Sequence, residues 1–337
     1  LMLVGFWVFV YNIGRTLLKV GFPDVTERHF GIALGFFVLL TTLGFLLAID
    51  FVHPIFGSSP LTRSHVVAAH ATLAVFGAVL TTIIGALYQL GTMFTQTTLR
   101  GIDTDLQRIE EVAYPSGVVL LAGGRLFGSG TLGRVGGILI AGSLLGFSLI
   151  LARRLYETRV ERTPMLSRYV VVALSLSVWS GFAAVAWVRE PLAMGALFGA
   201  PGTIHLLVFG VIGFVVLGTL YHIVPFIIWV HRYSDRLGLE EVPMIDDLYD
   251  HRLAAADFGF LLGGLILLVV TDLADLAEDA TGMAGVMALV GAILFTTNMV
   301  ITVRDHSPHT LGSVLFGTIG TDRNDAAIDG DVENVGP

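Results

Sequence analysis

Long runs of apolar residues, separated by shorter polar segments, dominate the chain. A helix needs about 20 mostly apolar residues to cross a bilayer. The runs of that length cover residues 30–50, 65–92, 134–153, 167–188, 203–230, 254–272 and 283–303. Two further segments are weaker, because 1–12 is short and 112–129 is glycine-rich and contains Arg125. The pattern predicts an all-α polytopic membrane protein, built as a bundle of transmembrane helices.

The positions of the basic residues indicate whether the two weaker segments also span. If all nine segments cross the membrane, fifteen of the nineteen Lys and Arg residues fall on one side. Cytoplasmic loops are enriched in Lys and Arg, so that side is expected to be cytoplasmic. If 112–129 did not span, the basic residues of 153–162 would lie outside. We therefore expect about nine transmembrane helices within residues 1–303, located in the cell membrane, with a cytoplasmic C-terminus.

Composition supports this class of protein and excludes others. Hydrophobic residues make up 54% of the chain and charged residues 14%, against roughly 25% charged residues in an average soluble domain. A net charge of −8 without a basic patch excludes a nucleic-acid partner, and the absence of cysteine excludes thiolate metal sites. The acidic segment 304–337 is expected to be a disordered cytoplasmic tail. A single Lys among nineteen basic residues favours a prokaryote, specifically a halophilic archaeon.

Two of the spans, 65–92 and 203–230, share a sequence pattern. The patterns are His70-x5-Phe76-Gly77-x7-Gly85-x-Leu87-Tyr88 and His205-x3-Phe209-Gly210-x7-Gly218-x-Leu220-Tyr221. From the Phe-Gly pair onward the spacing is identical, and both helices run in the same direction in the expected topology. His70 and His205 are therefore predicted at similar depth near the outer surface. Ionisable side chains at such a depth are costly and usually functional.

A pair of intramembrane histidines is suited to holding a haem. Two imidazoles can bind the iron from opposite sides, while the second nitrogen of each ring donates to a backbone carbonyl. Gly77 and Gly210 would leave room for the porphyrin, and Arg125 is expected at the depth of its propionates. The alternative is structural: the histidines are hydrogen-bonded residues of the core, the glycines pack helices, and Arg125 extends to the outer surface.

These motifs resemble those of the haem-copper oxidase subunit I superfamily, most closely its C-type (cbb-type) branch. The span 65–92 resembles the family's second helix. The tenth-helix pattern is matched by His205-x4-Gly210-x2-Gly213-Phe214-x3-Gly218-x-Leu220-Tyr221-x2-Val224-Pro225. The resemblance implies one low-spin haem b with two axial histidines, His70 and His205, on helices that also carry Tyr88 and Tyr221. His65 is a competing candidate for the second-helix ligand.

The chain also departs from the family pattern. The family's tenth helix carries a His-x-His pair whose first member binds the high-spin haem, and that position is Thr203 here. The family's copper site needs an adjacent His-His pair, which the sequence lacks, and nine spans replace the family's twelve. The resemblance therefore implies a reduced member that keeps the low-spin haem b and argues against copper.

Three functions remain open on these grounds. The first is a membrane cytochrome b that carries electrons in a respiratory chain, with quinol or a soluble cupredoxin or cytochrome on the outer side and other membrane subunits as partners. The second is a divergent terminal oxidase or nitric-oxide-handling enzyme with a non-standard active site. The third is a non-redox membrane subunit or transporter. No catalytic residue is assigned, and His29 and His231 are expected to be interfacial residues at helix ends.

Overall fold

The computed structural model describes residues 2–56, 61–274, 277–310 and 312–313, and within them the chain is helical without a strand. The α-helices are α1 (Met2–Leu17), α2 (Val25–Val52), α3 (Arg63–Thr72), α4 (Thr81–Thr95), α5 (Ile102–Phe127), α6 (Gly130–Tyr156), α7 (Pro164–Arg189), α8 (Phe214–Arg232), α9 (His251–Ala274) and α10 (Glu278–His306). The π-helix η1 (Leu73–Leu80) joins α3 to α4, and a second π-helix, η3 (Leu206–Gly213), leads into α8. The 3-10 helices are η2 (Met194–Ala196), η4 (Ser234–Arg236) and η5 (Ile245–Leu248).

This architecture confirms the predicted all-α polytopic membrane protein. Seven helices in the described part of the chain are long and apolar enough to cross a membrane. Helix α5 adds another 26 residues, about 39 Å at 1.5 Å per residue, and the apolar α1 is shorter. The expected span 112–129 begins too late, because residues 102–111 form the first turns of α5. Of the predicted tail, residues 311 and 314–337 lie outside the described residues.

Polar residues fix where several helices begin. Asp24 forms a capping box with Glu27 at the start of α2, and the Thr163 side chain accepts from the Leu166 amide at the start of α7. Before α9, the amide groups of Leu253 and Arg252 donate to the Asp250 carboxylate and hold its pKa below the usual value. These side chains satisfy amide groups that have no partner within the first turn of a helix.

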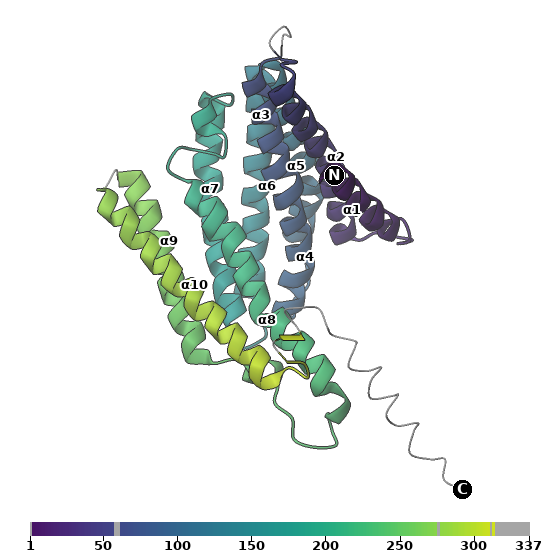
Figure 1. Cartoon of the computed structure of the whole chain (residues 1–337), viewed down its shortest axis with the longest axis vertical. Coiled ribbons are helices and arrows are strands. Elements are labelled where there is room, and N and C mark those ends of the chain that lie inside the picture. The colour runs from purple at the N-terminus through teal and green to yellow at the C-terminus, as the bar shows by residue number, and fades with distance from the viewer. Residues whose placement is uncertain (1, 57–60, 275–276, 311, 314–337) are drawn as a thin grey trace.

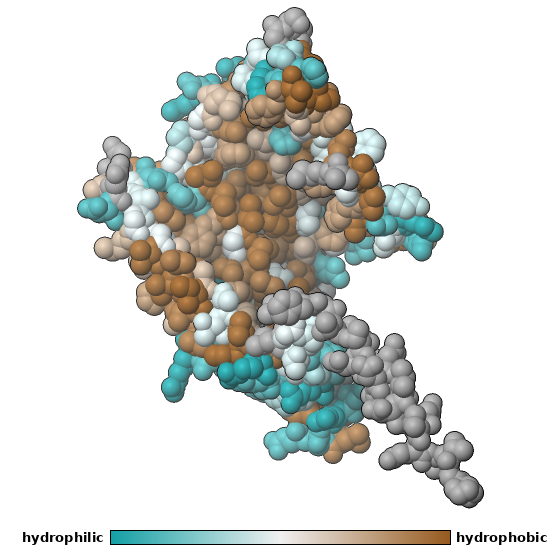
Figure 2. All heavy atoms as spheres, viewed as in Figure 1, coloured by the Kyte–Doolittle hydropathy of each residue, from teal (hydrophilic) through white to brown (hydrophobic). Residues whose placement is uncertain are grey.

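The helices alternate in direction and form a central bundle with two wings (Figure 1). The hairpin α1–α2 lies on one side and the hairpin α9–α10 on the other, with α8 between them in this view. We call the end of the bundle where α4, α6, α8 and α10 end the basic end, because it holds Arg153, Arg154, Arg232 and Arg304. Figure 2 shows a broad apolar surface along the helices, with polar residues concentrated toward the ends of the molecule, as a bilayer environment requires.

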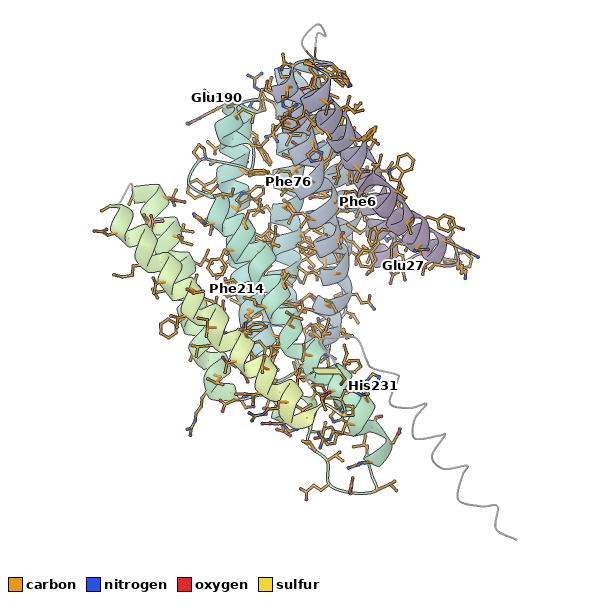
Figure 3. All side chains as sticks on the ribbon, in the orientation of Figure 1. Phe6, Glu27, Phe76, Glu190, Phe214 and His231 are labelled. Atoms are coloured by element: carbon orange, nitrogen blue, oxygen red, sulfur yellow. The ribbon has the colours of Figure 1, made fainter. Side chains whose placement is uncertain are left out.

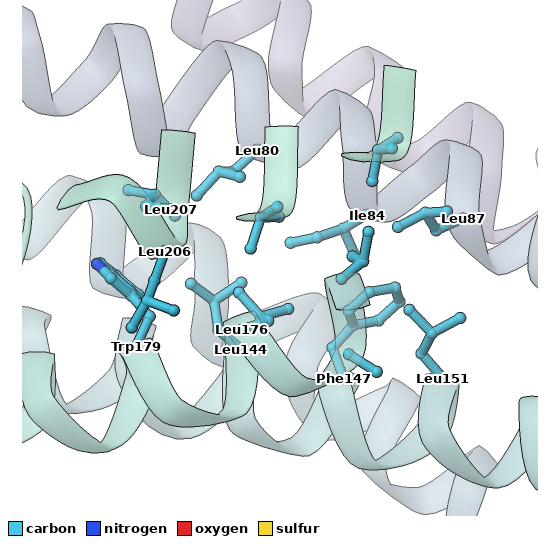
Figure 4. Packing of buried hydrophobic residues seen from close by; sticks show 14 of the residues in the cluster. Leu80, Ile84, Leu87, Leu144, Phe147, Leu151, Leu176, Trp179, Leu206 and Leu207 are labelled. Carbon is cyan, nitrogen blue, oxygen red and sulfur yellow. The ribbon is translucent and has the colours of Figure 1, made fainter. Parts of the chain in front are cut away.

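The core lies where the helices of the two repeated spans meet α6 and α7. Figure 4 shows side chains of the η1–α4 segment facing those of α6, α7 and η3. The labelled residues are Leu80, Ile84, Leu87, Leu144, Phe147, Leu151, Leu176, Trp179, Leu206 and Leu207. Phe76 and Phe214 also point into this core (Figure 3), and both are fully buried. The two spans that share the sequence pattern thus belong to one packed interior.

Glycines bring the backbones of α5 and α6 into contact. A Cβ atom on Gly136 would lie 2.7 Å from the Gly117 carbonyl oxygen and 2.8 Å from the Leu121 Cα. A Cβ on Gly117 would likewise lie 2.9 Å from the Gly136 oxygen. Helices without a hydrophobic driving force between them associate through such close contacts of small residues. This contact explains why the glycine-rich segment 112–129, which hydropathy left undecided, takes its place in the bundle.

We expect Gly136→Leu to destabilise the protein by about 1–3 kcal/mol or more, because the added side chain must push α5 away from α6. The measurement is thermal unfolding of the purified chain in detergent. Gly142→Leu, on the same helix, is the matched control, since a Cβ there meets no atom within 4 Å. Equal stability of the two variants would contradict the close contact.

Candidate functional site

His70 lies on α3 with its imidazole turned toward α2. Its Nδ1 lies 2.8 Å from the Leu40 carbonyl oxygen, and a Cβ on Gly44 would lie 3.0 Å from its Cε1. Gly44 therefore makes room for the ring, and the Leu40 carbonyl selects the tautomer with hydrogen on Nδ1. Nε2 has no hydrogen-bond partner among the described residues. A metal-bound histidine adopts this arrangement, in which one ring nitrogen donates to a carbonyl and the other is left for the metal.

His205 directly precedes η3 and faces α9 instead. Its Nε2 lies 3.2 Å from the Asp272 carboxylate, and the two side chains are 34% and 30% exposed. His205 can therefore bind iron through Nε2 only after it releases Asp272. The ring nitrogens of both residues suit a metal ligand, but His70 faces α2 and His205 faces α9, helices on opposite sides of the bundle (Figure 1), so the structure does not bring the two imidazoles together.

The structure shows that the two histidines do not occupy equivalent positions. Both shared patterns fold into an eight-residue π-helix, and the Phe-Gly pair occupies its fourth and fifth positions in each. Aligned on that pair, His70 corresponds to Thr203 and His205 corresponds to Thr72. π-Helices occur frequently at functional sites, and here they mark the part of the pattern that is the same in both helices.

The repeat extends beyond the two patterned helices. Gly77 packs on Phe36 of α2, and Gly210 packs on Ser175 at the corresponding place in α7. Gly117 of α5 packs on α6, and Gly264 of α9 packs on α10 in the same way. The contacts therefore relate a first unit of α2, α3–η1–α4, α5 and α6 to a second unit of α7, η3–α8, α9 and α10.

Gly77 and Gly210 were expected to leave room for a porphyrin. In the structure, a Cβ on Gly77 would lie 2.8 Å from the Phe36 ring, and Gly210 is covered by Ser175 and Leu265. These faces of the glycines are filled by neighbouring helices. The two glycines therefore serve helix packing in this arrangement.

Arg125 is buried near the end of α5 opposite the basic end. Its guanidinium donates to the Thr72 hydroxyl at 2.6 Å and to the carbonyl oxygens of Pro191, Ala196 and Leu197 at 3.0–3.2 Å. The expectation that it extends to the surface is wrong, because the residue is only 2% exposed. All four acceptors are neutral, so the positive charge has no carboxylate partner among the described residues.

Tyr88 and Tyr221 occupy equivalent positions nearer the basic end, and each donates to a buried carboxylate. The Tyr88 hydroxyl lies 3.0 Å from Glu110 of α5, and the Tyr221 hydroxyl donates to Asp257 of α9. Sequence reasoning missed both carboxylates. The signal for Asp257 was an acidic residue inside the apolar run 254–272, whereas Glu110 fell in a segment taken as a loop.

His29 and Arg168 complete these two clusters. His29 contacts Glu110 at 3.3 Å, and Arg168 donates to Asp257. His29 lies near the start of α2, as expected, but its side chain is covered by other residues and is only 1% exposed. Arg168, in the second turn of α7, is fully buried.

The remaining candidates are dispersed. The Nδ1 of His65, the competing ligand, is buried without a hydrogen-bond partner, and its ring lies near Gly128. His231 lies toward the basic end of α8 (Figure 3) and bonds to its own helix at Ile227. Within the described ranges, no three His, Asp or Glu side chains gather to hold a metal ion.

An apolar cavity of about 840 Å³ opens elsewhere, along the face of α7. Its lining includes Phe182 and Val185 of α7 and Ala196 and Pro201 of the following segment, but neither His70 nor His205. This cavity is a groove in the apolar exterior of the bundle. We therefore define the candidate site by the histidines and their hydrogen bonds, not by this cavity.

Comparison with known proteins gives no match to a family model, to a curated protein or to a solved structure.

We expect Arg125→Gln to loosen the segment 191–197, because its three carbonyl acceptors lose a charged donor. Hydrogen bonds to charged groups contribute about 1.5–3 kcal/mol, so amide exchange in this segment should rise about tenfold or more. Hydrogen–deuterium exchange with mass spectrometry measures it. Arg134→Gln is the control, since its guanidinium donates only to Val188. Unchanged exchange in Arg125→Gln would show that the segment is held by other contacts.

Proposed function

We propose that the chain is an integral membrane haem b protein that carries electrons through a low-spin haem with His70 and His205 as axial ligands. The observation that carries the proposal is the setting of His70, with Nδ1 on the Leu40 carbonyl, Nε2 free and Gly44 beside the ring. When bound, such a haem supplies one-electron oxidation and reduction.

The chain's own residues would orient and balance the group. The Leu40 carbonyl holds the imidazole of His70 in one tautomer and makes Nε2 a stronger donor. Asp272 places a negative charge beside His205. Arg125 keeps a buried positive charge that meets only neutral acceptors, and a membrane-embedded charge of this kind favours an anionic partner such as a propionate. His65 remains the alternative ligand to His70.

The proposal includes membership in the haem-copper oxidase subunit I superfamily, as a reduced member without copper. It is supported by the patterns around His70 and His205 and by the parallel course of their helices. We also propose that the basic end faces the cytoplasm of a prokaryotic cell, in line with the positive-inside rule. Quinol, or a soluble cupredoxin or cytochrome at the opposite end, would exchange the electrons, with other membrane subunits as partners.

We expect His70→Ala and His205→Ala each to reduce the haem content of the purified protein to background, because one axial imidazole cannot hold a low-spin haem. The measurement is the reduced-minus-oxidised absorption spectrum, together with quantified haem per chain. His231→Ala is the control, since the hydrogen bond of His231 within the described part of the chain is to Ile227 of its own helix.

Two outcomes would contradict the proposal. Full haem content in both variants would exclude these ligands, and an unaltered protein without haem would exclude the function. Ready binding of carbon monoxide by the unaltered reduced protein would favour the gas-reacting enzyme instead, since a six-coordinate haem has no open position.

A further inference from the structure

The two buried tyrosine–carboxylate clusters differ in the nitrogen-bearing side chain that contacts the carboxylate. In the first unit, Glu110 accepts from Tyr88 and contacts His29. In the second unit, Asp257 is bonded to Tyr221 and Arg168. Gly85 packs on the Cβ of His29 as Gly218 packs on the Cβ of Arg168, so these two residues occupy the same place in their units. The first unit thus has a titratable imidazole, His29, at the place where the second unit has a permanent cation, Arg168.

The second cluster is a fixed ion pair. Arginine does not lose its proton in proteins, and Arg168 and Asp257 are both fully buried. The Asn298 amide donates to the Tyr221 hydroxyl at 3.0 Å and so completes the network. With every charge balanced by a partner, this cluster has no reason to exchange a proton.

The first cluster has no permanent cation of its own. Nδ1 of His29 lies 2.7 Å from the Val25 carbonyl and therefore keeps its hydrogen. Nε2 lies 3.3 Å from the Glu110 carboxylate, whose other oxygen accepts from Tyr88. One proton between Nε2 and Glu110 makes the cluster neutral overall, whether it resides on the imidazole or on the carboxyl group. Removal of that proton leaves one negative charge.

Most other polar groups around the cluster are already partnered, although the buried hydroxyl of Thr26, one turn before His29, has no hydrogen-bond partner among the described residues. On α2 and α5, Arg28 pairs with Glu111 at 2.8 Å, and Gln107 donates to the same carboxylate. The Tyr114 hydroxyl donates to the Phe76 carbonyl at 2.6 Å. From α6, the apolar ring of Phe147 packs on Tyr88. The side chains of Arg28 and Glu111, the sequence neighbours of His29 and Glu110, are partly exposed, at 42% and 19%, so exposed polar groups stand beside the buried cluster on both helices.

We propose that His29, Glu110 and Tyr88 form a proton-exchange site at the basic end of the bundle. A proton passes from water, beside the Arg28–Glu111 pair, to the space between His29 Nε2 and Glu110, and returns by the same route. Only a proton moves, with no change of oxidation state. The site is independent of any haem, since His29 and His70 lie on different helices and bond to different residues.

The test is a pH-difference infrared spectrum of the full chain in lipid nanodiscs, between about pH 6 and 8, within the range where histidine titrates. Exposed glutamates stay ionised between these two pH values. Bands that shift on labelling with ¹³C-glutamate are expected to change with pH in the unaltered protein. Glu110→Gln should abolish this change, whereas Glu111→Gln, one residue away, should retain it.

His29→Arg copies the second unit into the first and provides an independent variant if Glu110→Gln does not fold. It should abolish the change as well, because a permanent cation holds Glu110 ionised. The proposal is overturned if the unaltered protein shows no glutamate-derived change over the range. It is also overturned if the change survives in Glu110→Gln or His29→Arg, or if Glu111→Gln removes it.

Discussion

A charge buried in a membrane protein must find a partner, and this constraint decides which helices become neighbours. Arg168 of α7 joins Asp257 of α9, and Arg154 of α6 joins Asp103 of α5 at 2.7 Å. Removing one member of such a buried pair typically costs about 3–5 kcal/mol, because the other charge stays behind in the low-dielectric interior. Both pairs lie toward the basic end, so that end is tied together across helices. Arg125 is the exception, with a buried charge and only neutral acceptors, and it supports the proposal of an anionic ligand.

The sequence predicted the helices well because an apolar run of sufficient length has few alternatives in a membrane. It was less successful where a helix is amphipathic at one end: α5 begins with charged residues, so hydropathy revealed only its second half. It also could not assign partners to Arg154 and Arg168, which lie near the ends of expected spans. Their carboxylate partners are 51 and 89 positions away in the chain, and no local pattern reveals such a contact. For the same reason His29 was taken as interfacial although Glu110 covers it.

The candidate site was predicted in part. The depth and the sequence pattern identified His70, and the structure adds the Leu40 carbonyl and Gly44, which lie on another helix and could not be inferred from spacing. The apparent equivalence of His70 and His205 came from their similar expected depth, although their distances from the Phe-Gly pair differ by two residues. The contacts show instead that each histidine corresponds to a threonine in the other unit. A haem bound by both residues would therefore have ligands at different positions in the two related units. It would not lie on a symmetry axis between the units.

The π-helix η1 separates two regions of one continuous helix, His70 at one end and Tyr88 at the other. Eighteen residues make five turns of a regular α-helix, which would align these two side chains on one side. A π-helical turn holds an additional residue and so rotates one end relative to the other by about 100°. The segment thus sets the phase between the proposed ligand for iron and the contact with Glu110. If all eighteen residues formed a regular α-helix instead, this phase would change, so that His70 could keep its contact with Leu40 only if Tyr88 lost Glu110.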